Sequence, residues 1–183
     1  MPGPGLTTRT ASTISLPLFS YPTASDRLML LFCSILLRKR AEQDYNTDLR
    51  TVRISAGGGA ITANGRPSST DVSYYVINKS SVSTSESSTA GSGTAYLGRP
   101  WSEYARVCFQ NTVLGAVINS AGWEIWSTST PNTADVTFQE YGNTGTGASG
   151  TRASFSTKLS SAISISTILG STYTGWVDTS YLA

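Results

Sequence analysis

The residues best suited to chemistry lie together in Leu97-Gly98-Arg99-Pro100-Trp101, where an arginine stands between a glycine and a proline. These two neighbours constrain the backbone, so that a charge and a large aromatic ring are presented within three residues. A guanidinium stays charged and offers a planar fork of donors to a carboxylate. A hydrophobic core needs no such order. We therefore take Arg99 as a candidate functional residue, with a surface salt bridge as the alternative.

The chain contains no histidine. This absence excludes Ser-His-Asp and Cys-His mechanisms, and it rules out a zinc site built on histidines. Any hydrolytic chemistry must therefore rest on carboxylates, Lys, Tyr or Arg.

The charge of the chain argues against a nucleic-acid partner. Charged residues make up 13% of the 183 residues, and the formal net charge is +2. Arg38-Lys39-Arg40 is the one basic cluster, whereas nucleic-acid-binding domains usually carry a basic face. The length suggests a single domain with a real core. Cys33 and Cys108 could pair, but Cys108 lies in an apolar run and is better interpreted as a small buried hydrophobic residue.

Residues 1–49 differ in amino-acid composition from the rest of the chain. Residues 1–27 are rich in Pro, Ser and Thr, which is typical of loop or disorder. The apolar run 28–37 is too short to span a membrane, and basic residues follow it instead of preceding it as in a signal peptide. Residues 28–49 could form one short helix. We expect an atypical, poorly ordered segment over 1–49 and one domain over 50–183.

After residue 50, short runs of β-branched and aromatic residues alternate with Gly, Ser, Asn and Thr, a pattern that indicates an all-β fold. The predicted strands are 60–64, 73–78, 105–111, 116–119 and 135–141. Residues 107–111 resemble 136–140, and 76–78 resemble 117–119. Degenerate repeats favour a solenoid, and among solenoids a parallel β-helix. A β-sandwich is the alternative. Residues 153–169 could form an amphipathic helix in a tail that packs outside the solenoid.

The motifs resemble those of the pectin methylesterases, which remove methyl groups from homogalacturonan. The resemblance rests on LGRPW, then AGWEIW and EYGNTGTGA, with AITANGR and YYVINKSSV upstream. The ending RASFSTKL…ILGSTYTGWVDTSYL is most similar to fungal members, and the likeness covers about residues 50–183. Several motifs in the same order are more specific than one short motif.

The resemblance implies a right-handed parallel β-helix and a mechanism with two aspartates and one arginine. One aspartate attacks the ester carbonyl, the other transfers protons, and the arginine orients the nucleophile. Arg99 matches the catalytic arginine, and Trp101 matches an aromatic residue of the sugar-binding cleft, with simple packing as its alternative. Trp123 and Trp126 are interpreted as structural. The resemblance also implies pectin as partner, no metal or other cofactor, a monomer, and secretion.

The aspartates of the family have no clear counterpart here. No DFIFG-like block precedes AITANGR, and Asp44 and Asp48 are better interpreted as solvated loop charges. Asp71 and Asp135 should face solvent or cap turns, and Asp178 has no reason to approach Arg99. We therefore expect de-esterification of pectin to be impaired, with a non-catalytic pectin-binding remnant as the alternative. A structural Ser/Thr-rich solenoid is a third hypothesis, against which LGRPW argues. We also expect poor export, since no ordinary signal peptide begins at Met1.

Overall fold

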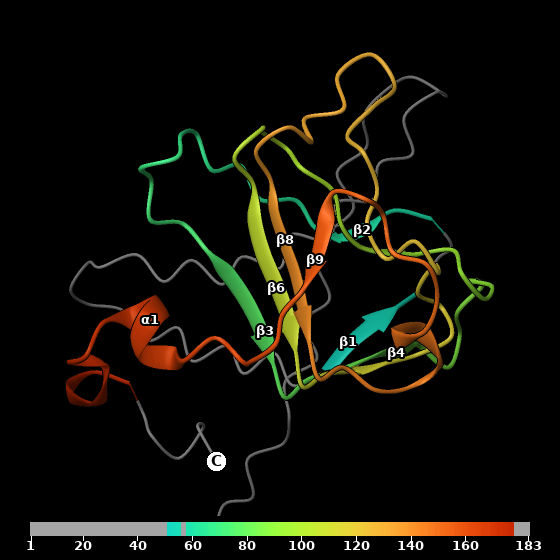
Figure 1. Ribbon diagram of the computed structural model, residues 1–183. Helices are drawn as coiled ribbons and strands as arrows, with labels where there is room; N and C mark the ends of the chain where they lie inside the picture. Colours follow the sequence, from blue (N-terminus) through green and yellow to red (C-terminus); the bar gives the residue numbers. More distant parts are fainter. Residues whose placement is uncertain (1–50, 56–57, 178–183) are drawn as a thin grey trace, which may run out of the picture.

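Short parallel strands make up nearly all the regular structure of residues 51–55 and 58–177, the parts of the chain that a computed structural model describes (Figure 1). The strands are β1 (Thr51–Ile54), β2 (Ala60–Thr62), β3 (Tyr75–Asn78), β4 (Ser81–Thr84), β5 (Tyr96–Gly98), β6 (Arg106–Gln110), β7 (Val113–Leu114), β8 (Thr137–Tyr141) and β9 (Ser156–Lys158). Within these ranges, helical structure is limited to α1 (Ile165–Leu169) and 3-10 turns at Thr146–Ala148 and Tyr173–Gly175.

The strands form three parallel sheets, which the chain visits in turn. The sheets have the orders β1-β4-β7, β2-β5 and β3-β6-β8-β9. Thr51 pairs with Ser81, and Arg106 pairs with Thr137, so one coil takes about thirty residues. This winding is a parallel β-helix, as the sequence predicted.

Aromatic side chains from successive coils fill the interior. The ring of Trp123 stacks on Phe138 with centroids 4.3 Å apart, and it meets Phe109 edge-on at 6.0 Å. Phe155 continues the row at 6.3 Å from Phe138. Trp123 is only 1% exposed, which confirms its interpretation as a structural residue.

A tight corner repeats at the ends of β3, β6 and β8. The residues that follow these strands are Lys79, Asn111 and Gly142, with φ of 49°, 51° and 59°. Because Asn78 pairs with Gln110 and Gln110 with Tyr141, the three corners lie one above the other. Left-handed backbone suits glycine and asparagine and is uncommon for lysine.

Buried polar groups join these corners between coils. The backbone N–H of Thr112 donates to Asn143 Oδ1 at 3.0 Å, and the N–H of Ser80 donates to Thr112 Oγ1 at 3.4 Å. The corners are therefore held by side chains as well as by the strand ladders.

Two sequence-based predictions were wrong in detail. Residues 116–119 form no strand, and Ile118 makes only an isolated bridge to Ala95. The backbone turns there, since Ile118 N–H donates to Gly115 O and Asn119 Nδ2 donates to Gly93 O. The likeness of 76–78 to 117–119 therefore does not reflect stacked strands. The other repeat does pair, but with Val107 beside Phe138, two residues from the sequence match.

The amphipathic helix predicted over 153–169 is also wrong in extent. Residues Ser156–Lys158 add β9 to the edge of β8, and only Ile165–Leu169 are α-helical. An open strand edge offers a ladder of backbone hydrogen bonds, which overrides weak helical periodicity.

The C-terminal tail contacts the outer face of the β3-β6-β8-β9 sheet. The side-chain amide of Gln110 donates to Ile163 O at 3.1 Å and accepts from Ile163 N–H at 2.8 Å. In the sheet Gln110 follows Phe109, which is part of the core, so its side chain points the opposite way. The tail therefore packs outside the solenoid, as expected, and Figure 1 shows α1 beside β3.

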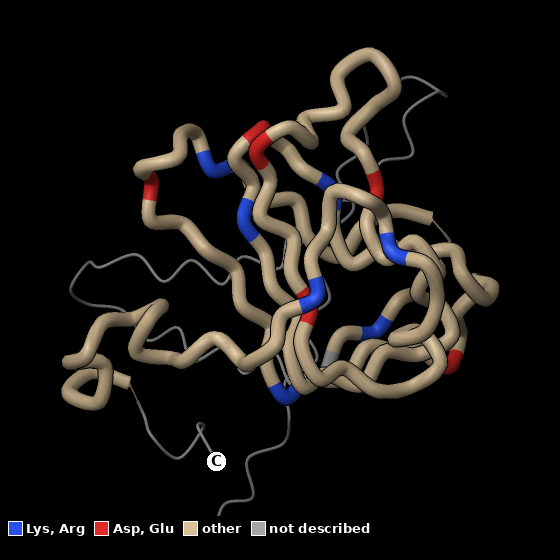
Figure 2. The backbone as a smooth tube through the Cα atoms, in the orientation of Figure 1, with Lys and Arg blue, Asp and Glu red and all other residues tan. Residues whose placement is uncertain are grey.

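Charges are sparse on this scaffold, and Figure 2 shows the basic residues of the described part spread singly over several elements. No helix within residues 51–55 and 58–177 is long and apolar enough to cross a membrane.

Candidate functional site

Arg99 follows the end of β5, on a coil that lies between two others. Its backbone N–H donates to Thr62 O at 3.1 Å, and Glu124 N–H donates to Gly98 O at 3.0 Å from the coil on the other side. Gly98 has no room for a side chain, because a Cβ there would collide with Thr62 Oγ1 and with the ring of Trp123. The glycine before Arg99 thus allows the coils to approach closely.

Trp101 lies over the segment that follows β2. A Cβ on Gly65 would sit 3.3 Å from Trp101 Cδ1, so the glycine of AITANGR leaves room for the indole ring. Ser102 Oγ donates to Arg66 O at 2.5 Å and joins the same two segments. Trp101 remains 50% exposed, so one large aromatic surface faces solvent.

Trp126 completes an aromatic cluster around Arg99, which we call the Arg99 cluster (Arg99, Trp101 and Trp126). The centroids of the two indole rings are 5.0 Å apart, with an interplanar angle of 58°. The Cζ atom of Arg99 lies 4.6 Å from the centroid of Trp126. A guanidinium over an indole face is a favourable cation–π contact. Trp126, which was interpreted from the sequence as structural, therefore contacts both candidate site residues.

The loop after Trp126 is tied back to the Arg99 cluster by Asn132. Trp126 N–H donates to Pro131 O at 3.1 Å, which closes the loop. Asn132, with φ of 55°, donates from Nδ2 to Pro100 O at 3.3 Å and to Trp101 O at 3.2 Å. One amide thus connects the loop that carries Trp126 to the segment that carries Arg99 and Trp101.

The guanidinium of Arg99 has spare donor capacity. Its Nε atom is shielded from solvent and has no hydrogen-bond partner within the described residues. A buried N–H without an acceptor costs about 1–3 kcal/mol. The Nη atoms make no hydrogen bond to a described residue either, so they are the donors available to an acceptor.

No described carboxylate serves Arg99. Asp71 Oδ1 accepts from Ser73 N–H at 2.8 Å, which caps a turn as expected, and Asp135 is exposed. Asp44, Asp48 and Asp178 lie outside the described residues, as does Cys33.

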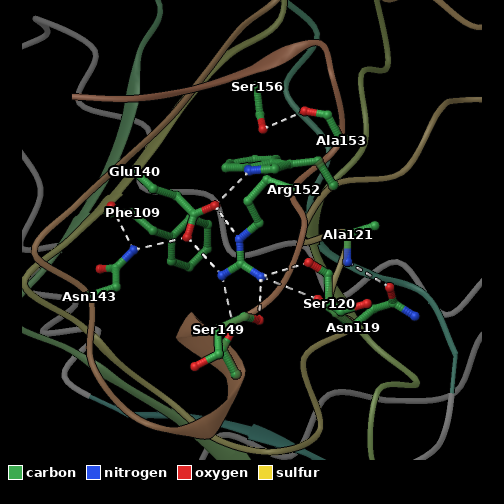
Figure 3. Close-up of polar contacts among 12 residues, drawn as sticks. Phe109, Asn119, Ser120, Ala121, Glu140, Asn143, Ser149, Arg152, Ala153 and Ser156 are labelled. Carbon is green, nitrogen blue, oxygen red and sulfur yellow. Dashed lines mark hydrogen bonds and ion pairs between the residues drawn. The ribbon is translucent and has the colours of Figure 1, made fainter.

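The one ion pair within the described residues joins Glu140 and Arg152, and it does not involve Arg99. Arg152 Nε donates to Glu140 Oε1 at 2.9 Å, and Nη2 donates to Oε2 at 3.0 Å. Trp123 Nε1 and Asn143 Nδ2 donate to the same carboxylate (Figure 3). The remaining donors of Arg152 bind backbone carbonyls, including those of Ser120 and Gly147. The carboxylate of Glu140 is therefore occupied by structural hydrogen bonds between the last coils, and it is not placed to attack a substrate.

Tyr74 and Cys108 are not placed to act as bases or nucleophiles at neutral pH. Burial raises the pKa of Tyr74 to about 12, and its hydroxyl donates to Gln139 Oε1 at 2.5 Å under the guanidinium of Arg106. Burial, with the nearby charge of Glu140, raises the pKa of the Cys108 thiol to about 12. Cys108 is fully buried, which confirms the prediction of a small hydrophobic residue. No cluster of three or more His, Cys, Asp or Glu able to hold a metal occurs in the described part.

The Arg99 cluster was found only in part from the sequence. Arg99 and Trp101 were identified by their motif, and the structure places them together. The approach of Trp126 and Asn132 to these residues was not predicted, because it depends on how residues 127–131 fold back. A proline followed by asparagine, Pro131-Asn132, was the available signal for a turn.

Comparison with known proteins assigns this sequence to a family. The sequence profile described as Pectinesterase matches residues 43–167. The chain belongs to the pectinesterase family. A pectinesterase from Aspergillus aculeatus is 62% identical over 136 residues, which are 74% of this chain and 41% of the relative. A pectinesterase from Aspergillus niger is 57% identical over 138 residues, or 75% of this chain and 41% of the relative. The chain thus spans well under half the length of these members of the family.

Solved structures of the family share the fold. The crystal structure of the pectin methylesterase from Aspergillus niger in deglycosylated form matches with a TM-score of 0.62 and 36% identity. The match covers 69% of this chain and 41% of that one. The pectin methylesterase from carrot matches with a TM-score of 0.57 at 24% identity, a likeness of fold alone.

Proposed function

We propose that this chain is a pectinesterase-type protein that recognises homogalacturonan at the Arg99 cluster, with residues 50–183 acting as one monomeric domain. The supporting observation is the partly buried guanidinium of Arg99, held against one indole ring beside a second that is half exposed. Sugar rings present flat C–H faces that an indole covers well, and galacturonate units carry carboxylates that a guanidinium binds.

In de-esterification, a carboxylate attacks the methyl-ester carbonyl, and the departing methoxide takes a proton from a general acid and leaves as methanol. Water then cleaves the acyl-enzyme bond, which releases the galacturonate and regenerates the attacking carboxylate. Arg99 is proposed to orient the attacking carboxylate through its planar fork of donors. Within the described residues no carboxylate pairs with Arg99, so slow hydrolysis is expected.

The first test is methanol release from methylated pectin by the purified 183-residue chain. We expect a rate near background. Robust release would contradict this expectation, and Asp44→Asn and Asp48→Asn would then show whether either aspartate supplies the nucleophile.

Binding without hydrolysis is the second candidate function. It is favoured by the guanidinium of Arg99, which has no carboxylate partner within the described residues. A carboxylate of de-esterified pectin could supply that partner, with Trp101 packed against the adjoining ring. An ion pair of this kind contributes at most about 1 kcal/mol and is screened by salt.

Titration of oligogalacturonates tests the binding function. De-esterified oligomers should bind weakly at low salt and less at high salt, and fully methylated oligomers should bind less because they lack the charge. Arg99→Ala should weaken binding of the de-esterified oligomer about fivefold. Arg53→Ala is the matched control, since Arg53 is an exposed arginine on β1. Equal binding by the wild type and Arg99→Ala would remove Arg99 from the site.

The substrate class also bears on localisation. Pectin is a cell-wall polymer, so a protein that acts on it must leave the cell. We therefore propose that the protein acts outside the cell. In support, Asn78-Lys79-Ser80 has the form of an N-glycosylation sequon, which is a feature of secreted proteins.

A further inference from the structure

The corner after β3 carries a sequence feature that the pectin site does not use. Asn78-Lys79-Ser80 fits the acceptor pattern for N-glycosylation, in which serine or threonine stands two residues after asparagine. No other asparagine of the chain has serine or threonine at that distance.

The corner presents Asn78 suitably for a glycan. Asn78 is exposed at the end of β3, and Lys79 turns the chain sharply with φ of 49°. Asn78 Oδ1 accepts from Asn111 Nδ2 at 3.0 Å, whereas its own Nδ2 makes no hydrogen bond to a described residue. The nitrogen that would carry the sugar is therefore the free end of the side chain.

Ser80 keeps its place after the turn without covering the asparagine. Its Oγ donates to Asn78 O at 2.9 Å, so the hydroxyl folds back against the backbone. Ser80 is buried in the folded corner, and its part in recognition would be played while the chain is still unfolded.

We infer that Asn78 is an N-glycosylation site and carries an asparagine-linked oligosaccharide in the exported protein. The amide Nδ2 attacks the anomeric carbon of a lipid-diphosphate-linked oligosaccharide supplied by the secretory pathway. A C–N bond forms, the bond from carbon to the diphosphate oxygen breaks, the diphosphate takes the electron pair, and Nδ2 loses one proton. This inference rests on the proposed export of the chain and does not depend on pectin binding.

The glycan and the Arg99 cluster would lie at different corners of the coils. Asn78 ends β3 in the β3-β6-β8-β9 sheet, whereas Arg99 follows β5 in the β2-β5 sheet. The described hydrogen bonds of Asn78 and Ser80 involve no residue of the Arg99 cluster. A glycan on Asn78 would therefore replace no described contact of that cluster.

The experiment expresses the full 183-residue chain in yeast behind a cleavable leader, and collects protein from both cells and medium. Leader removal marks the molecules that entered the secretory pathway. Intact mass is measured before and after digestion with an endoglycosidase that cleaves asparagine-linked glycans. Asn78→Gln and Ser80→Ala remove the sequon from either end, and Ser80→Thr preserves it as the matched control.

The wild type and Ser80→Thr should lose mass on digestion, and Asn78→Gln and Ser80→Ala should not. Leader-processed wild type with no removable mass would overturn the inference, as would Asn78→Gln that still carries the glycan. Pectin binding is measured separately on unglycosylated chain from bacteria. Failure of the proposed function would therefore leave the glycosylation result unaffected.

Discussion

The neighbours of Arg99 fix the orientation of its guanidinium. Within the described residues no carboxylate neutralises its charge. Its Cζ atom lies 4.6 Å from the centroid of Trp126, and its backbone is bound to the coil of Thr62. A cation–π contact of this kind is worth about 0.5–1 kcal/mol at a partly exposed site. The guanidinium is therefore held in one orientation before a carboxylate arrives, which lowers the entropy cost of binding that carboxylate.

The glycine that precedes Arg99 should be intolerant of any side chain. Gly98→Ala would force a Cβ into Thr62 and Trp123, and overpacking of this kind costs about 1–3 kcal/mol. Urea denaturation should show that loss in the free energy of unfolding. Gly91→Ala is the matched control, since its Cβ would meet Thr94 at an ordinary 3.6 Å. Equal stability of Gly98→Ala and wild type would show that the two coils can separate freely.

At the scale of single residues, the sequence predicted part of the site. Arg99 and Trp101 could be predicted because they are neighbours in a specific motif. The reason for Gly98 could not, since the atoms it would meet belong to residues 36 positions before it and 25 positions after it. The packing of one coil on the next, and not local geometry alone, determines which side chain fits there.

At the scale of elements, the position of the loop that carries Trp126 depends on the side-chain amide of Asn132. Asn132→Asp removes both donors to the segment of Arg99 and Trp101 while keeping the size of the side chain. Asn132→Gly also removes them but accommodates φ of 55°. Both variants should lose the near-ultraviolet circular dichroism that arises from indole rings 5.0 Å apart, and should bind de-esterified oligogalacturonate several-fold more weakly.

Comparison of the two variants separates the hydrogen bonds from the backbone angle. A normal signal in Asn132→Gly would show that the backbone angle alone positions Trp126. Asn111→Gly is the control, because Asn111 has a similar φ of 51° and its side-chain amide donates to Asn78 and not to the segment of Trp101 or Trp126. It should leave the aromatic spectrum unchanged.

Four of the nine described strands were predicted from the sequence, because β-branched runs bounded by Gly and Asn lie at β2, β3, β6 and β8. The sequence did not predict β1, β4, β5, β7 and β9. It also did not predict the register. The repeat matched Phe109 with Phe138, whereas the structure pairs Phe109 with Glu140. A shift of two residues keeps both phenylalanines in the core, so the hydrophobic pattern could not distinguish the two registers. The tail was misjudged because β9 depends on the edge of β8, which lies outside its own sequence.

For the molecule as a whole, the buried thiol predicts a loss of stability at high pH. The pKa of Cys108 is raised from 9.0 to about 12, so the folded state retains a proton that the unfolded state releases. The contribution of the protonated thiol to the free energy of unfolding is complete below pH 9 and is lost as pH rises toward 12. Tyr74, raised from 10.0 to about 12, acts in the same direction above pH 10.

Denaturation across pH 8 to 12 measures this effect. Cys108→Ala should be less stable near pH 8, because it leaves a small cavity, but its stability should decline less steeply above pH 9. Parallel pH profiles for the two proteins would contradict the assignment of the alkaline loss to Cys108.

The pairing of each strand with one about thirty residues away also governs how such a chain can begin to fold. Tyr75 meets Val107, and Ser81 meets Val113, so no hairpin can form early and hold its place. Closing loops of that length costs entropy before any ladder repays it, and parallel sheets of this kind fold slowly. Two neighbouring coils, about sixty residues, are therefore the smallest piece that can retain a strand pair on each sheet. Every growing chain must expose apolar strands until its second coil is complete.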